Sequence, residues 1–346
     1  GTLVMNGGSV TTTGAQSYGE AVTLGANTIL TAGIGDVTLN STINGAYALT
    51  VNSTGVTTFG GAIGNTTALT SVTTNTGGTL VMNGGSVTTT GAQSYGEAIT
   101  LGADTTLNAG TANVTLSNTV NGAYALAVNS TGTTTFGGAI GGGTALTSVT
   151  TNTGGTLVMN GGAVTTTGVQ SYGEAITLGA DTTLSASHVT LDDAVSGAHA
   201  FVVNGAATLN GGSVNTGTAT QSYSSTVDLG ADTTLTASIV TLNGAVSGAH
   251  TFTVNGATAM NGGSVTTGAQ SYSGALTLGA DTTLSAGNGD VTLSSTVDGG
   301  YALTVNSTGV TTFGAALGGG APLTRVTTNA GGTLVMNGGS VTTTGA

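Results

Sequence analysis

The side chains of this 346-residue chain best suited to chemistry are its three histidines, His188, His199 and His250. Histidine is the commonest general base and a frequent metal ligand near neutral pH. His199 and His250 occupy one position of a repeat, so we expect them two coils apart, about 10 Å, which is too far to share a metal ion. His188 precedes Asp192 by four residues in a predicted strand, about 13 Å away, so these two cannot bind one ion either.

Carboxylates are the second candidates. Asp192-Asp193 is the only adjacent acidic pair, and acid–base hydrolysis would need a further carboxylate across a cleft. We therefore interpret this pair as a solvated turn. Three glutamates follow the phrase Gln-Ser-Tyr-Gly, namely Glu20, Glu97 and Glu174. Later repeats place Ser225 or Gly274 there, so no coil is expected to depend on this carboxylate.

Two further acidic sets fall at predicted corners between strands. The first consists of Asp104, Asp181, Asp232 and Asp281, with Asn27 as the counterpart in the first repeat. Asp and Asn are common turn residues, and the alternative is an isolated divalent cation at this corner. The second set, Gly33-Ile34-Gly35-Asp36 and Gly287-Asn288-Gly289-Asp290, matches a fragment of the nine-residue calcium-binding repeats, without their repetition.

Basic residues are almost absent, since Arg325 is the only arginine, there is no lysine, and 13 Asp and Glu give a formal net charge of −12. Nucleic acids and anionic membranes are excluded as partners, because both need clustered Lys or Arg. Phosphate-binding loops usually need a lysine, and pectin-cleaving sites need basic residues too. With no cysteine there is no thiolate metal site. The sequence predicts no catalytic residue, cofactor or metal site, and the protein is not expected to be an enzyme.

These residues are set in a tandem repeat. The phrase that begins Thr2-Leu3-Val4-Met5-Asn6 returns at Thr79, Thr156, Ala206, Ala257 and Thr333, at spacings of 77, 77, 50, 51 and 76 residues. One third of the long spacing and one half of the short one both come to about 25 residues, which predicts coils of about 25–26 residues. The chain 1–346 is then one continuous solenoid with repeats 2–78, 79–155, 156–205, 206–256 and 257–332 and a partial repeat 333–346.

Short segments of each coil alternate apolar residues with Thr or Ser, as in Val22-Thr23-Leu24 and Leu49-Thr50-Val51. This alternation is typical of strands with one buried face, and the abundant glycine and β-branched residues disfavour helix. The sequence predicts an all-β fold, a parallel β-helix with three short strands per coil and about 13 coils. An array of β-sandwich domains is the competing fold, but the loss of 26 residues would destroy such a domain.

Outward threonines are a possible binding surface, because a flat threonine-rich face can bind ice when its threonines are in register on consecutive coils. The segments Thr11-Thr12-Thr13 and Thr57-Thr58 raise this possibility. Successive coils differ in their outward residues, so the sequence predicts no such register.

Three phrases resemble repeats of very large bacterial surface proteins: Gly-Gly-Ser-Val-Thr-Thr-Thr-Gly-Ala-Gln-Ser-Tyr (84–95), Thr-Phe-Gly-Gly-Ala-Ile-Gly (58–64) and Leu-Thr-Ser-Val-Thr-Thr (69–74). They are similar to the repeats of filamentous-haemagglutinin and autotransporter-type adhesins, and the resemblance covers the entire chain. It implies a right-handed β-helix that is secreted, extracellular or on the bacterial cell surface, and used for adhesion or biofilm. These motifs are structural and identify no ligand.

The expected function is a non-catalytic stalk or adhesin segment of a large secreted bacterial surface protein. The alternatives are a self-assembling extracellular filament or sheath subunit, and a carbohydrate-binding β-helix. Expected partners are neighbouring repeats of the same longer chain or end-to-end copies, with a host-surface or polysaccharide ligand. No apolar run is long enough to cross a bilayer, so no membrane insertion is expected in this segment. Residues 1–15 are identical to residues 332–346, so we expect the repeats to continue beyond both ends.

Overall fold

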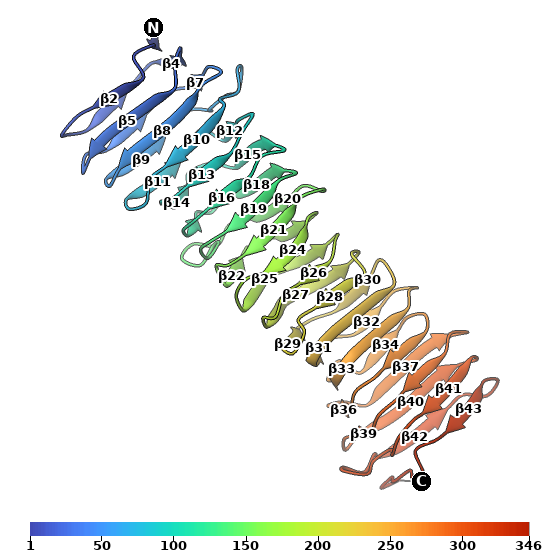
Figure 1. Cartoon of the computed structure of the whole chain (residues 1–346). Helices are drawn as coiled ribbons and strands as arrows, with labels where there is room; N and C mark the ends of the chain where they lie inside the picture. Colours follow the sequence, from blue (N-terminus) through green and yellow to red (C-terminus); the bar gives the residue numbers. More distant parts are fainter. Residues whose placement is uncertain (346) are drawn as a thin grey trace. The chain divides into compact units, whose positions relative to one another are not determined.

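The computed structural model describes residues 1–345, which form strands and turns but no helix. Over this range there is accordingly no helix that could span a bilayer. The chain divides into two compact units, Gly1–Thr182 and Thr183–Ala346. Each unit is a parallel β-solenoid with three strands per turn, in which a strand pairs with the strand on the same face one turn later (Figure 1).

Three ladders of parallel strands form the first unit, and each is named by its first strand. The β1 ladder contains β1 (Thr2–Met5), β4 (Ala21–Leu24), β7 (Ile43–Asn44), β12 (Ser86–Thr88), β15 (Thr105–Gly110), β18 (Ala125–Ser130), β20 (Ser148–Thr151) and β23 (Val169–Tyr172), with Ile63 bridging β7 and β12. The β2 ladder contains β2 (Ser9–Thr11), β5 (Thr28–Gly33), β8 (Ala48–Ser53), β10 (Ser71–Thr74), β13 (Gln93–Tyr95), β16 (Val114–Leu116), β19 (Thr133–Phe136), β21 (Thr156–Met159) and β24 (Ala175–Leu178). The β3 ladder contains β3 (Gln16–Tyr18), β6 (Val37–Leu39), β9 (Val56–Phe59), β11 (Thr79–Met82), β14 (Ala98–Leu101), β17 (Val120–Asn121) and β22 (Ala163–Thr165), with Ile140 bridging the last two.

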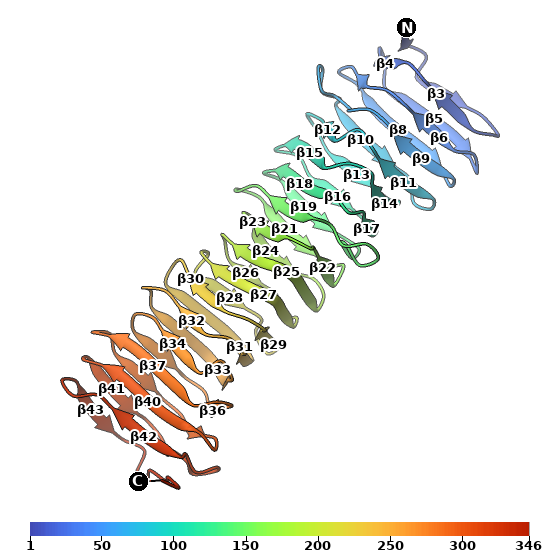
Figure 2. The same ribbon diagram turned by 180° about the vertical axis from the view of Figure 1, so that it is seen from behind.

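The second unit has the same plan, and β25 (Thr182–Leu191) begins at the boundary. Three of its strands, β27 (Phe201–Leu209), β31 (Thr233–Leu242) and β33 (Phe252–Met260), pass a corner and contribute one half to each of two faces. The β28 ladder contains β26 (Val195–Ser196), β28 (Ser213–Asn215), the first halves of β31 and β33, β35 (Gln270–Tyr272), β38 (Val291–Leu293), β41 (Val310–Phe313) and β43 (Thr333–Met336). The β29 ladder contains the first half of β27, β29 (Thr220–Tyr223), the second halves of β31 and β33, β36 (Leu276–Leu278) and β39 (Val297–Asp298). The β30 ladder contains the second half of β27, β30 (Val227–Leu229), β32 (Val246–Ser247), β34 (Ser264–Thr266), β37 (Thr282–Gly287), β40 (Ala302–Ser307) and β42 (Arg325–Thr328), several of which are labelled in Figure 2.

The parallel β-solenoid and its three strands per turn are confirmed, but the predicted coil length and number are wrong. Paired residues are separated by 18 residues at Phe252 and Gln270 and by at most 24 at Ile140 and Val164. The described residues therefore make about 17 turns instead of about 13. The predicted coils 2–27 and 28–53 each contain four strands, β1 to β4 and β5 to β8, so each is longer than one turn. Only segments such as 54–78 contain the three strand positions of a single turn.

The sequence repeat is therefore not a whole number of turns, and successive copies of one phrase rotate around the axis. Thr2–Met5 lies on the β1 ladder, Thr79–Met82 on the β3 ladder and Thr156–Met159 on the β2 ladder. Each copy still points its apolar residues inward, because the alternation along the strand is unchanged. Identical phrases thus pack against different neighbours on each face.

Stacked apolar side chains fill the interior of each unit, and a polar pair recurs among them. On the β3 ladder, Leu80, Ile99 and Val120 are successive register partners and all are buried. In each phrase Gln-Ser-Tyr the tyrosine hydroxyl donates to the glutamine Oε1, as from Tyr95 to Gln93 at 2.9 Å. The Gln93 amide in turn donates to the Asn108 carbonyl at 2.9 Å. This buried brace satisfies polar groups that would otherwise destabilise the core.

Candidate functional site

The three histidines lie apart from one another. His199 and His250 precede strands on different ladders, at Phe201 of the β29 ladder and Phe252 of the β28 ladder, so the expected stacking of the two rings is wrong. His188 Nε2 is 2.9 Å from Thr208 Oγ1. His250 Nδ1 is 3.7 Å from the exposed Asp232 carboxylate, so this contact is a surface pair.

The adjacent acidic pair forms a turn, as predicted. Asp192 and Asp193 are both exposed. Asp192 Oδ1 accepts a hydrogen bond from the Asn210 amide at 2.6 Å, and Asp193 Oδ1 accepts one from the Ala194 N–H at 2.7 Å. Among residues 1–345 no group of three or more His, Cys, Asp or Glu side chains gathers where it could bind a metal ion.

The corner aspartates connect each turn to the next. Asp104 Oδ1 accepts the Ala125 backbone N–H at 2.9 Å, and Asn27 Oδ1 accepts the equivalent N–H of Ala48 at 3.0 Å. Asp232 and Asp281 accept from Thr251 and Ala302 in the same way. The Thr251 hydrogen bonds, with a smaller contribution from His250, lower the pKa of Asp232. The interpretation of these side chains as turn residues is confirmed.

The two Gly-x-Gly-Asp segments make the same connection between turns. Asp36 Oδ1 accepts the Val56 N–H at 2.8 Å, and Asp290 Oδ1 accepts the Val310 N–H at 2.7 Å. At the equivalent place of the second repeat, Asn113 accepts from Thr133 at 2.9 Å. Because an amide serves as well as a carboxylate, the group required at this position is an uncharged or charged acceptor oxygen.

The glutamates after Gln-Ser-Tyr-Gly are placed differently from the prediction that no coil depends on them. Glu97 and Glu174 are fully buried, whereas Glu20 in the first turn is exposed and lies 4.0 Å from the N-terminal amine. Thr57 donates to Glu97 Oε1 at 3.1 Å, and Thr134 donates to Glu174 Oε1 at 3.2 Å. Sequence reasoning missed this because Ser225 and Gly274 replace the glutamate in the second unit.

Burial sets the electrostatics of these two carboxyls. Loss of solvation raises the pKa of Glu97 from 4.5 to about 7, against a smaller lowering by the Thr57 and Thr74 hydroxyls. The pKa of Glu174 is raised to about 7 for the same reason, with Thr134 and Thr151 opposing. A buried acid without a cationic partner favours its neutral form.

Outward hydroxyls lie in register on the β28 ladder, so the prediction that they do not is wrong. Six side chains on consecutive turns are register partners: Ser213, Thr234, Thr253, Ser271, Thr292 and Thr312. Nearly every strand carries Ser or Thr on its outward side, so a phrase that has rotated to another face still presents a hydroxyl. The rotation therefore preserves the surface as well as the core.

A shallow groove lies beside a second polar row, on the β30 ladder. Ser247, Thr266 and Ser285 are register partners on three consecutive turns. Together with Gly248, Ala249, Thr267 and Gly287 they line an open hollow of about 590 Å³. Hydroxyls spaced by one turn, about 4.8 Å, are thus presented along one concave surface.

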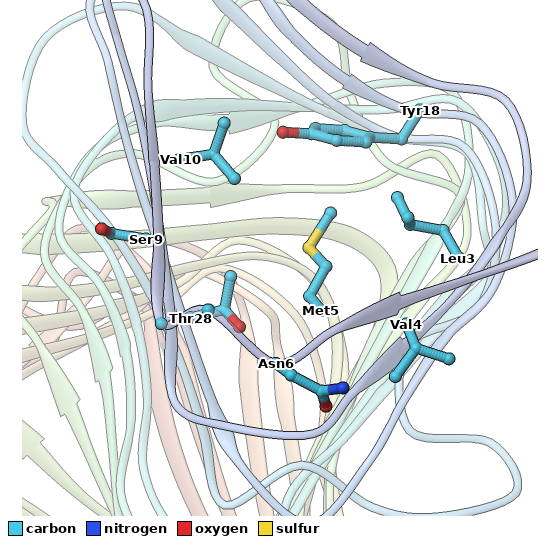
Figure 3. Close-up of a pocket in the computed structure, with 10 residues that line it drawn as sticks. Leu3, Val4, Met5, Asn6, Ser9, Val10, Tyr18 and Thr28 are labelled. Atoms are coloured by element: carbon cyan, nitrogen blue, oxygen red, sulfur yellow. The ribbon is translucent and has the colours of Figure 1, made fainter.

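A second hollow lies at the N-terminal face, where no earlier turn covers the core. Figure 3 shows the Met5 side chain pointing between Tyr18, Val10 and Leu3. The volume of this pocket is about 280 Å³. In the next copy of the phrase the equivalent Leu80 and Tyr95 are fully buried, so the lining is core surface that lacks a neighbouring turn.

No protein-family model, no curated protein and no solved structure matches this chain.

Proposed function

We propose that this chain is a non-catalytic structural segment, a stalk or spacer, of a secreted bacterial surface protein. The supporting observation is the pairing of each strand with the turns on both sides, as β11 pairs with β9 and with β14. Backbone hydrogen bonds and stacked core residues then connect successive turns within each unit. Such a ladder resists extension and separates whatever lies at its two ends.

Mechanical unfolding tests the stalk. We expect the chain, pulled from its ends, to unravel turn by turn, with length steps that are multiples of about 20 residues, or roughly 65 Å of extended chain. Collapse of a whole unit in one step at low force would contradict the proposal. Antibody labelling of intact cells tests the location independently, and labelling that requires lysis would contradict a surface protein.

Carbohydrate binding is a second candidate, favoured by the hydroxyl-lined groove at Ser247, Thr266 and Ser285. A polysaccharide lying along the axis would meet one hydroxyl per turn. We expect Thr266→Val to weaken glycan binding at least several-fold, whereas Thr241→Val, on the outward side of the β29 ladder, leaves it unchanged. Equal binding by both variants, or no binding of any glycan by the parent chain, would reject this candidate.

Self-assembly is a third candidate, favoured by the exposed core surface around Met5. End-to-end association would cover this surface and generate open fibres. Sedimentation at increasing protein concentration tests it, with Met5→Glu expected to abolish association and the outward Thr23→Glu expected to preserve it. A monomer at every concentration would reject the filament.

A further inference from the structure

The buried glutamates occur only where a particular kind of turn precedes them. Glu97 follows segment 54–78 and Glu174 follows segment 131–155, each of which is a single long turn with the sequence Gly-Gly before the next repeat. The repeats that lack this turn carry Ser225 or Gly274 in place of the glutamate. The glutamate and the long turn therefore occur together.

The geometry explains this association, because the glutamate side chain reaches across the long turn. Glu174 bonds Thr134, 40 residues earlier and two turns away. Gly155 lies in the turn between them, and a Cβ at Gly155 would be 2.5 Å from Glu174 Oε1 and 2.6 Å from the Gly132 carbonyl oxygen. The glycine leaves the space through which the carboxyl passes. Three consecutive turns thus meet at one acid group.

The carboxyl is incompletely satisfied as an anion. Oε2 of both Glu97 and Glu174 has no hydrogen-bond partner, and neither has the Thr151 hydroxyl beside Glu174. A buried carboxylate normally needs several donors or a cation to compensate the loss of water. Each site provides one hydroxyl bond to Oε1.

No positive charge faces either site. The strands packed against Glu97 present Thr57, Thr74 and the neutral phenol of Tyr95, which donates to Gln93. The ionisable group on the next turn is Asp36, whose Oδ1 lies 2.6 Å from where a Cβ on Gly55 would be. At the Glu174 site, Asn113 replaces Asp36 and Tyr172 replaces Tyr95. The surrounding groups are neutral or acidic, so none favours the anion.

We propose that Glu97 and Glu174 are neutral acids that clamp three successive turns of the first unit, and that loss of the proton releases these turns. This proposal does not depend on the stalk function. In the neutral form the acid accepts the threonine hydroxyl and fills the space above the glycine. In the charged form the carboxylate has to reach water, which requires the turn that carries it to move outward.

The direction of the pH effect follows from the raised pKa. The folded clamp binds its proton up to about pH 7, whereas an unfolded glutamate loses it near 4.5. Between these values the folded state carries more protons than the unfolded state, so stability decreases as pH rises through this window. Below about 4.5 the clamp is at full strength, and above about 7 its contribution is lost.

Carbon-13 NMR of the side-chain carboxyls tests the protonation directly, because the chain has only three glutamates. We expect two resonances to titrate near pH 7 and the third, from the exposed Glu20, to titrate in the ordinary range. Glu97→Gln and Glu174→Gln assign the two signals. Titration of all three together at the ordinary value would overturn the proposal.

Hydrogen exchange tests the release of the turns. The Gly96 and Gly173 N–H groups bond the previous turn next to the two acids, and the equivalent Ser224 and Ser273 N–H groups do so where there is no glutamate. Between pH 5 and pH 7, the protection of Gly96 and Gly173, corrected for intrinsic exchange, should decrease by up to about tenfold per pH unit. Ser224 and Ser273 should show no such loss, and the two glutamine variants should abolish it. Constant protection at Gly96 and Gly173 would overturn the clamp even if the acids titrate near pH 7.

Discussion

At the scale of single residues, the acidic side chains of this chain act as acceptors for backbone groups of the next turn. Asp104 accepts from Ala125, and Asn27 does the same from Ala48. We therefore expect Asp104→Asn to leave the free energy of unfolding nearly unchanged, whereas Asp104→Ala lowers it by about 1 kcal/mol through an unsatisfied N–H. Chemical denaturation of the two variants measures this difference. Equal losses would show that the charge matters and the acceptor does not.

Close approach of successive turns makes certain glycines indispensable. A Cβ at Gly84 would lie 2.1 Å from the Gly61 carbonyl oxygen of the turn beneath, while a Cβ at Gly7, in the same phrase of the first turn, would meet nothing within 4 Å. We expect Gly84→Ala to destabilise the protein by about 1–3 kcal/mol, because backbone atoms have to move. Gly7→Ala is the matched control and should melt with the parent chain. Similar melting temperatures for both variants would contradict the close packing of turns at this corner.

The same contrast shows what the sequence could predict at this scale. The corner position of Asp104 was predictable, because Asp and Asn alternate there and both are turn residues. The burial of Glu97 was not, because its partner Thr57 lies 40 residues earlier and two turns away. A signal was present in the sequence, since the glutamate is found where the long turn precedes it. That signal becomes interpretable only once the ladder assigns the neighbours.

At the scale of strands and turns, the register between neighbouring ladders decides which deletions the fold tolerates. Removing Thr54–Gly78 takes out one turn and joins β8 to β11. Strands of the types in 43–53 would then pair directly with those in 86–95, as Val195–Ser196 already pairs with Val214–Asn215. With Gly96→Ser and Glu97→Ser, which copy Ser224-Ser225, this deletion should keep the β-rich circular dichroism and a cooperative melt.

The control is a deletion of almost the same length. Removing Thr28–Ser53 takes out four strands, so Gln16-Ser17-Tyr18 would face the loop at 60–64, and Gln16 would lose its bond to the Thr31 carbonyl. We expect this variant to be insoluble or to melt much earlier. Comparable stability of the two deletions would mean that partner identity does not matter along the ladder.

These deletions also separate what was predictable about the fold from what was not. Alternation within strands such as Val22-Thr23-Leu24 predicted the buried side of each strand correctly, because it is a local property. The turn length depends on how many strands fit between two corners, and 25–26 residues with three strands looks the same in sequence as 26 residues with four. The phrase repeats at a spacing that evolution duplicated, which differs from the spacing at which the backbone closes a turn.

At the scale of the whole molecule, the fold is held by stacking alone, with no bound ion required. The corner carboxylates bond backbone N–H groups, as Asp290 does with Val310. Exhaustive chelation should therefore leave the circular dichroism spectrum and the melting temperature unchanged. A fall of many degrees that calcium reverses would show that the aspartate corners bind a cation in solution.

A fusion of two copies tests the turn-by-turn logic over the longest range. Because residues 1–15 repeat as 332–346, two chains can share one copy of this phrase. In the fusion the second copy of Glu20 would follow segment 308–332, another long turn, in which Thr311 corresponds to Thr57 and Gly332 to Gly78. The environment of this glutamate would then match that of Glu97, although its own sequence is unchanged.

We expect the fused chain to show three glutamate carboxyls that titrate near pH 7 and one in the ordinary range, where the single chain would show two and one. Glu20 in the first copy remains exposed beside the N terminus and provides the internal control. Replacing Thr311 by Val only in the shared junction should remove the hydroxyl bond and raise the pKa of the junction glutamate further, because that hydroxyl stabilises the anion. If the junction glutamate titrates in the ordinary range instead, the next turn does not stack on segment 308–332, and the environment of a residue is not set by the turns that precede it.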